Sequence, residues 1–279
     1  MTNVRAEPED ELEDAVEHIG AAPGSKTAKD RQYVTALARG LSVLRAFTAE
    51  RRELGSSAIA RLTKLPQPTV WRLCKTLQDE GYLMPAPGGD RFQLSPSVLN
   101  LGHSALASIP IAEIAKPTMQ VLADRFVAGC SLGMRDGLHM ILVQRCQGNA
   151  TLVLNWQVGS RLPIAESAIG TAYIAALDEA ERRTLLDELK ASDQARWPAR
   201  EKTIQAMLQE YRQYGYIANC GGFHSQINTV ALGFRTGDRT QYALTCGAPA
   251  DRLDLPAMRA EVAPALQQLT RALGADRDG

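Results

Sequence analysis

The chain has 279 residues, about two domains of roughly 150 residues each, and 45% of them are hydrophobic. This content is sufficient for globular cores and excludes a fibrous or largely disordered protein. The 31 Lys and Arg residues balance the 31 Asp and Glu residues, but the charge is unevenly distributed. Residues 1–30 hold three basic and eight acidic residues, whereas residues 31–95 hold ten basic and five acidic ones. Only this second segment has the charge expected of a nucleic-acid-binding surface.

The cysteines and the apolar runs indicate the compartment and exclude some kinds of site. Five cysteines are widely spaced, and none forms a C-x-x-C motif. We therefore expect no disulfide framework, no metal and no cofactor. The first 30 residues are acidic where a signal peptide is basic and then apolar, and no apolar run approaches the roughly 18 residues of a membrane span. We expect a cytoplasmic protein that does not contact a membrane.

Residues 31–95 are predicted to form a winged helix-turn-helix domain that follows a disordered acidic tail, residues 1–30. Apolar residues at helical spacing predict three helices, the third of which has a proline in its first turn and Gly81 after its last. Two short strand patterns flank a turn rich in proline and glycine. The expected order is a helix, a short helix, a third helix and a β-hairpin, at residues 34–47, 56–62, 67–80 and 82–94.

The third helix has the side-chain pattern of a helix that binds in the major groove of DNA. Apolar residues at i, i+3, i+4 and i+7 predict one buried face, formed by Val70, Leu73, Cys74 and Leu77. The remaining surface presents the residues that we expect to contact DNA, namely Gln67, Pro68, Thr69, Trp71, Arg72 and Lys75. Arginine bonds guanine bidentately, glutamine pairs with adenine, and hydroxyl and N–H groups at a helix start hold phosphates. Arg91 of the hairpin is expected to contact phosphate or the minor groove.

Each of these residues also has a plainer interpretation. Any exposed helix carries polar residues, Trp71 is of a type that packs against protein more often than it reads DNA, and Arg91 also suits a solvated turn. The order of the elements and the confined basic charge favour DNA binding over these alternatives.

Beyond the hairpin we expect a linker helix at 96–110 and an α+β domain at 111–279. Strand and helix patterns are interspersed without strict βαβ alternation, which predicts helices packed on an antiparallel sheet. The strands are expected at residues 130–134, 140–145, 151–156, 216–220, 228–234 and 240–246. One helix is expected to begin after Pro110 and to end near Phe126. Further helices are expected at residues 167–177, 179–190, 201–214 and 255–273.

Several motifs at matching spacing resemble the IclR-type bacterial transcriptional regulators. In the basic segment they are RGLSVL at 39–44, AIA at 58–60, PTVWRL at 68–73, GYL at 81–83 and FQLSP at 92–96. Further along the chain they are VGSRLP at 158–163, SAIGTA at 167–172, YGY at 214–216 and NTVA at 228–231. The resemblance implies a winged helix-turn-helix joined by a linker helix to a GAF-like α+β effector domain. It also implies homodimers or homotetramers that bind a palindromic double-stranded DNA operator.

The second domain is expected to bind a small-molecule effector. Small residues after Pro163 open a helix whose free N–H groups and dipole favour an anion, so a small carboxylate is the expected ligand, although Ser167 is equally a helix cap. The resemblance places Cys130, Asn219, Thr229 and Cys246 near the cavity. With the aromatic and apolar residues expected to wall it, the predicted effector-binding set is Cys130, Met134, Trp156, Leu162, Ser167, Ala168, Ile169, Gly170, Asn219, Thr229 and Cys246, with Phe223 as a further wall residue.

The residues also leave two alternative functions to be weighed. The segment 129–133 matches G-x-S-x-G, the nucleophile motif of serine hydrolases, with Ser131 as the nucleophile. That mechanism needs a strand, a sharp turn and a helix with a histidine beside the serine, whereas here a helix precedes and a hairpin follows. The other alternative is a small-molecule sensor that acts on a protein partner. The interpretation we favour is a ligand-responsive DNA-binding regulator that is not an enzyme.

Overall fold

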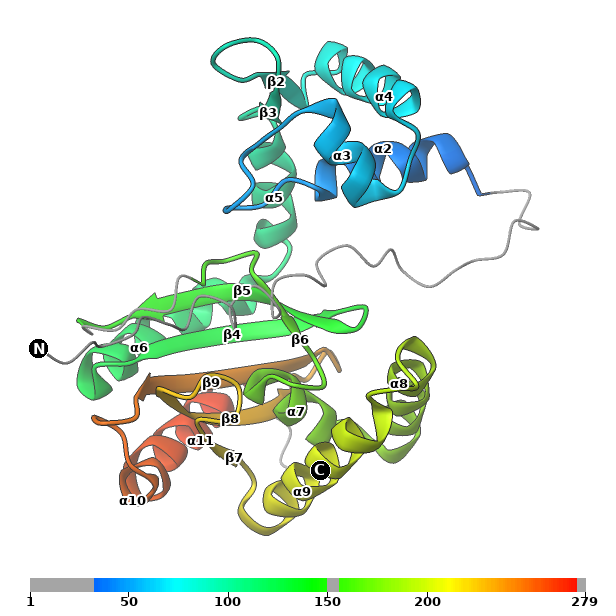
Figure 1. Cartoon of the computed structure of the whole chain (residues 1–279). Helices are drawn as coiled ribbons and strands as arrows, with labels where there is room; N and C mark the ends of the chain where they lie inside the picture. The colour runs from blue at the N-terminus through cyan, green and yellow to red at the C-terminus, as the bar shows by residue number, and fades with distance from the viewer. Residues whose placement is uncertain (1–32, 150–155, 275–279) are drawn as a thin grey trace, which may run out of the picture. The chain divides into compact units, whose positions relative to one another are not determined.

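The computed structural model describes residues 33–149 and 156–274. The acidic tail predicted at 1–30 lies outside the described residues, as does all but Trp156 of the strand predicted at 151–156. The chain divides into two compact units between Ala105 and Leu106 (Figure 1). Each unit has a hydrophobic core of its own.

The first unit is a winged helix-turn-helix. It contains three helices, α2 (Thr35–Arg45), α3 (Ser56–Thr63) and α4 (Gln67–Asp79). Its antiparallel sheet has the order β1-β3-β2 and is formed by β1 (Glu53–Leu54), β2 (Leu83–Pro85) and β3 (Phe92–Leu94). The sequence pattern does not predict β1, because a strand of two residues has no periodicity of its own.

Local backbone chemistry fixes the turn between α3 and α4. Lys64 ends α3 in the left-handed conformation, with φ of 56°. The carbonyl of Pro66 then accepts hydrogen bonds from the backbone N–H groups of Thr69 and Val70, which starts α4. Gly81 follows the end of α4 with φ of 79°, a value that glycine adopts without strain.

The buried stripe of α4 completes the core of the first unit. Val70 and Cys74 are fully buried, and Leu73 and Leu77 are half-buried, as the periodicity predicts. They pack with residues of the other two helices and of the sheet, namely Val43, Ala46, Phe47, Leu54, Ile59, Leu83 and Phe92. The helix buries one side only, so its opposite side faces solvent.

Helix α5 (Val98–Ala107) follows the wing, and none of its described residues is buried. Helix α6 begins at Pro110, so the linker helix predicted at 96–110 is shorter and ends before Ser108. No single helix in the described part of the chain is long and apolar enough to cross a membrane. The helices α5 and α6 meet that length and composition only as a pair, across the break between them.

The second unit is built on a six-stranded antiparallel sheet with the order β6-β5-β4-β9-β8-β7. Its strands are β4 (Gly129–Asp136), β5 (His139–Gln147), β6 (Arg161–Pro163), β7 (Ile217–Cys220), β8 (Ile227–Arg235) and β9 (Gln241–Pro249). The strand β6 is too short to show the alternation from which strands are predicted.

Helices cover both faces of this sheet, which is the predicted α+β architecture (Figure 1). One face packs against α6 (Pro110–Phe126) and the C-terminal helix. The other packs against α7 (Ala168–Ala175), α8 (Glu179–Ser192) and α9 (Trp197–Tyr214). The C-terminal helix comprises α10 (Leu255–Ala257), a π-helical turn η1 (Met258–Val262) and α11 (Ala263–Ala272). Pro264 lies two residues after the end of the π turn, and its missing N–H removes one α-helical hydrogen bond.

Alternate residues of the central strands point to opposite faces of the sheet and pack against different helices. Cys130 of β4 lies between Cys146 of β5 and Cys246 of β9, and all three thiols are buried in the core formed with α6 and the C-terminal helix. The next residue along β4, Ser131, points to the opposite face of the sheet. Its neighbours across the strands are Arg145 and Thr245.

The close packing of α7 depends on the absence of a side chain at Gly170. A Cβ there would lie 2.2 Å from the backbone oxygen of Ile164, which cannot move aside without shifting the chain. We predict that Gly170→Ala destabilises the second unit by about 1–3 kcal/mol and lowers its calorimetric unfolding midpoint. The matched control is Gly102→Ala on α5, where a Cβ meets nothing within 4 Å. Equal unfolding midpoints of the second unit in the two variants would contradict this packing argument.

Candidate functional site

The exposed side of α4 gathers the side chains that the sequence assigns to DNA contact. Five of them are exposed and Thr69 is half-buried; the exposed ones are Gln67, Pro68, Trp71, Arg72 and Lys75. Arg91 is exposed on the loop that joins β2 to β3. The structure therefore leaves these groups accessible, and their contact with DNA stays a prediction.

Trp71 both packs against protein and remains accessible. Its ring meets the ring of Phe92 edge-on, with the centroids 5.8 Å apart, and the Nζ atom of Lys75 lies 5.5 Å from the Trp71 centroid. The residue is still 48% exposed. Trp71 thus links α4 to the wing strand β3 and helps to position the Lys75 ammonium group.

Among residues 33–105 of the first unit, the structure shows no ion pair. All nine ion pairs found in the described residues lie in the second unit. Lys75 Nζ donates instead to the neutral Oε1 of Gln78, at 3.2 Å.

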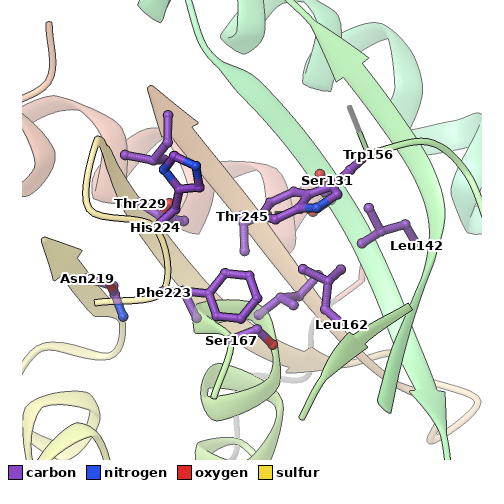
Figure 2. A pocket seen from close by; sticks show the side chains of 13 residues that line it. Ser131, Leu142, Trp156, Leu162, Ser167, Asn219, Phe223, His224, Thr229 and Thr245 are labelled. Carbon is purple, nitrogen blue, oxygen red and sulfur yellow. Dashed lines mark hydrogen bonds between the residues drawn. The ribbon is translucent and has the colours of Figure 1, made fainter. Parts of the chain in front are cut away.

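A hollow of about 450 Å³, partly open to solvent, lies in the second unit against the sheet face that carries Ser131 and Thr245 (Figure 2). Figure 2 shows the rings of Trp156 and Phe223 at this hollow, and their centroids are 5.9 Å apart. Its walls are mostly apolar with a few polar groups, which is typical of sites for small molecules. The lining residues are Ser131, Leu142, Trp156, Leu162, Ser167, Ala168, Ile169, Asn219, Phe223, His224, Ile227, Thr229 and Thr245.

Most of the residues predicted to bind an effector lie on this wall. They are Trp156, Leu162, Ser167, Ala168, Ile169, Asn219 and Thr229, together with Phe223. They come from α7, from three strands and from the loops before β6 and after β7. The fold thus brings together residues that are up to 73 positions apart, and their role in binding stays a prediction.

The expectation that Cys130, Met134, Gly170 and Cys246 also line the cavity is wrong. Cys130 and Cys246 face the opposite side of the sheet, where a hydrogen bond to Cys246 and burial raise the pKa of the Cys130 thiol. Met134 follows a bulge at Leu132/Gly133 and packs on the same core as the cysteines. Gly170 lies against the Ile164 backbone, which leaves no room for a ligand.

A second hollow, of about 410 Å³, adjoins the first and shares Ser131, Trp156, Ile227, Thr229 and Thr245 with it. It contains Arg145, which the sequence analysis missed. Arg145 Nη1 donates to Ser131 Oγ at 2.9 Å, and Nη2 donates to Gln147 Oε1 at 2.8 Å. The guanidinium carbon lies 6.0 Å from the centroid of Trp156. Burial lowers the pKa of Arg145, because it disfavours the charged form.

The polar side chains of the first hollow differ in how many of their hydrogen-bonding atoms have partners in the described protein. Ser167 Oγ donates to the Pro163 carbonyl at 2.6 Å and accepts from the Gly170 N–H at 3.3 Å, so Ser167 is the cap of α7. Asn219 Oδ1 accepts from the Gly222 N–H at 2.8 Å and holds the loop after β7. His224 Nδ1 is buried without a hydrogen-bond partner among the described residues. A buried nitrogen in this condition favours a ligand that supplies the missing bond.

Ser131 does not occupy the strand-turn-helix position of a hydrolase nucleophile. It is the third residue of β4, which continues to Asp136, and it is 3% exposed. Its Oγ accepts a hydrogen bond from Arg145, which cannot serve as a base. His224 lines the same hollow, but no hydrogen bond joins it to Ser131 in the described structure.

Comparison with known proteins decides the family. The IclR helix-turn-helix domain matches residues 36–86, and the C-terminal domain of the bacterial transcriptional regulator IclR matches residues 103–275, more than half of the chain. The chain belongs to the IclR family of bacterial transcriptional regulators. An IclR-type regulator combines a DNA-binding helix-turn-helix domain with a ligand-binding domain, and the matching relatives are regulators rather than enzymes.

Relatives resemble this IclR-type regulator over most of its length. The HTH-type transcriptional regulator TsaQ1/TsaQ2 of Comamonas testosteroni is 31% identical over 246 residues, which are 87% of this chain and 88% of the relative. The structure of an IclR family transcriptional regulator from Brucella abortus is 35% identical with a TM-score of 0.79, covering 90% of this chain and 95% of that one. An IclR homologue from Microbacterium hydrocarbonoxydans, solved in complex with 4-hydroxybenzoate, shares the fold with a TM-score of 0.68. It is 20% identical and covers 85% of this chain and all of that one.

Proposed function

We propose that this regulator reads a palindromic operator with the exposed side of α4 and changes its affinity for that operator when a small molecule occupies the hollow of the second unit. The observation that carries the DNA-binding part is the burial of only one stripe of α4, which leaves Arg72 and Lys75 in solvent. In this proposal Gln67 and Arg72 read bases, the start of α4 holds a phosphate, and Arg91 contacts the backbone from the wing. A protein that acts on bacterial DNA works in the cytoplasm.

The first test is binding to DNA from upstream of the regulator's own gene. The affinity should fall steeply with salt, because the cations of the first unit displace counterions from several phosphates. We predict that Arg72→Ala loses about 1–3 kcal/mol of binding free energy at one base-pair position of each half-site. The matched control is Arg212→Ala on α9, an exposed arginine of the second unit. Fluorescence anisotropy titrations against half-site variants measure both effects, and equal losses for the two variants would contradict the assignment.

The proposal includes self-association into a homodimer or homotetramer. Val34, Leu37 and Leu41 form an exposed apolar stripe along α2, and Leu99 of α5 is 72% exposed. Such surfaces suit contact with a second copy. We predict that Leu99→Glu lowers the mass measured by light scattering, whereas Asn100→Glu on the same helix does not. A monomeric unmodified protein would rule out this part of the proposal.

The effector part of the proposal rests on the first hollow. Its apolar rings and aliphatic side chains suit the body of a small molecule, and the Nδ1 atom of His224, which has no hydrogen-bond partner among the described residues, suits a polar group of the ligand. A small carboxylate is the class we propose, and the 4-hydroxybenzoate bound by the Microbacterium homologue belongs to it. The ligand alters DNA binding by favouring one arrangement of the protein over another.

A thermal-shift screen of small carboxylates, phenols and central metabolites tests this part. A ligand at 100 times its Kd stabilises the protein by about 2.7 kcal/mol, which is readily measured. We predict that Thr229→Phe, which places a ring in the hollow, removes the shift without affecting DNA affinity measured in the absence of ligand. The matched control is Thr203→Phe on the exposed side of α9. A shift that persists in Thr229→Phe would place the ligand elsewhere.

A further inference from the structure

The second hollow contains an ordered arrangement of polar groups on neighbouring strands. Arg145, Ser131 and Thr245 lie side by side on β5, β4 and β9. Two residues further along, the same strands and β8 present a parallel row, Gln147, Gly129, Gly247 and Thr229. Because both rows have the same two-residue phase, they face the same side of the sheet.

The glycine on β4 makes room for the arginine. A Cβ at Gly129 would lie 2.8 Å from Arg145 Nη2 and 3.2 Å from Nη1. Gly129 does not have a positive φ, so its backbone conformation does not require glycine. The missing side chain instead allows the guanidinium to extend over the strand, between its hydrogen bonds to Ser131 and Gln147.

Trp156 connects this polar region with the apolar hollow. It lines both hollows, with Arg145 near its ring and Phe223 packed at a tilt of 44°. A ligand that extends past Trp156 therefore meets apolar walls with one part and a cation with the other. The planar guanidinium matches the geometry of a carboxylate or another oxyanion.

We infer that the two hollows form one effector site, in which Arg145 holds the acidic group of the effector while Trp156, Phe223 and Leu162 enclose its apolar body. This inference rests on the effector-binding function proposed above. It places the acidic group on the sheet rather than at the start of α7. There the Ser167 hydroxyl already accepts from the Gly170 N–H, and the Ser167 carbonyl accepts from Thr171.

Gln147→Glu tests the role of Arg145 with little change of shape. The substitution replaces the amide oxygen that accepts from Nη2 by a carboxylate, which neutralises the arginine in place. Calorimetric titration compares benzoate and benzenesulfonate with the uncharged benzamide. We expect the unmodified protein to bind an acid at least about tenfold more tightly than benzamide, and Gln147→Glu to lose this preference while keeping its affinity for benzamide. Whichever of benzoate and benzenesulfonate binds more tightly shows whether the site prefers a carboxylate or a sulfonate.

The control for Gln147→Glu is Gln241→Glu. Gln241 Oε1 likewise accepts from an arginine, Nε of Arg235 at 3.1 Å, but neither residue lines either of the two described hollows. This variant should keep the preference for acids. Arg145→Lys, which keeps the charge but loses the planar fork, should have an intermediate preference. Unfolding midpoints and DNA affinity without ligand confirm that each variant is folded.

The outcomes separate this inference from the function on which it rests. If Thr229→Phe abolishes binding of all probes but Gln147→Glu keeps the full preference for acids, the hollow is the effector site and the role of Arg145 is overturned. If Thr229→Phe leaves binding unchanged, both the site and the inference fail. Absence of binding of every probe to the unmodified protein also overturns the inference.

Discussion

The two-residue alternation of β4, β5 and β9 is the constraint on which the second unit depends. Helices cover both faces of this sheet, so every residue of its central strands faces one of two distinct environments. One phase supplies Cys130, Cys146 and Cys246, which act as small apolar residues beneath α6 and the C-terminal helix. The other phase supplies Ser131 and Arg145, whose burial is acceptable because they hydrogen-bond to each other.

The residues of α4 in the first unit likewise divide into a buried side that packs on the core and an exposed side that does not. The core takes one stripe of α4, centred on Val70 and Cys74, and the remaining sides of the helix contribute little to its stability. Exposed residues such as Arg72 are therefore not needed for the packing of this core. The ion pairs of the described chain lie in the second unit, where two of them join α8 to the sheet and another joins α9 to the segment before α7.

Helical periodicity predicted the first unit well, because the spacing of apolar residues that defines each helix lies within a short stretch of sequence. The third helix was expected at 67–80 and is found at 67–79, with the predicted side buried. The residues that line the cavity were harder to predict, since an error of one residue along a strand moves a side chain to the other face of the sheet. Cys130 was expected at the cavity, whereas its neighbour Ser131 lies there. Arg145 and His224 carry no local signal at all, because only the sheet order brings β5 and the loop before β8 to the same hollow.

The separate cores of the two units restrict how an effector can act. The segment that joins them is α5, which buries none of its described residues, and the short break before α6. A ligand can shift the population of DNA-binding arrangements only by the ratio of its affinities for those arrangements. Linkage then requires operator DNA to change the affinity for the effector by the same factor as the effector changes the affinity for DNA. A partly open pocket that contains the half-buried guanidinium of Arg145 is suited to this, because a small rearrangement of its walls changes the interaction with an acidic ligand more than it changes the apolar contacts.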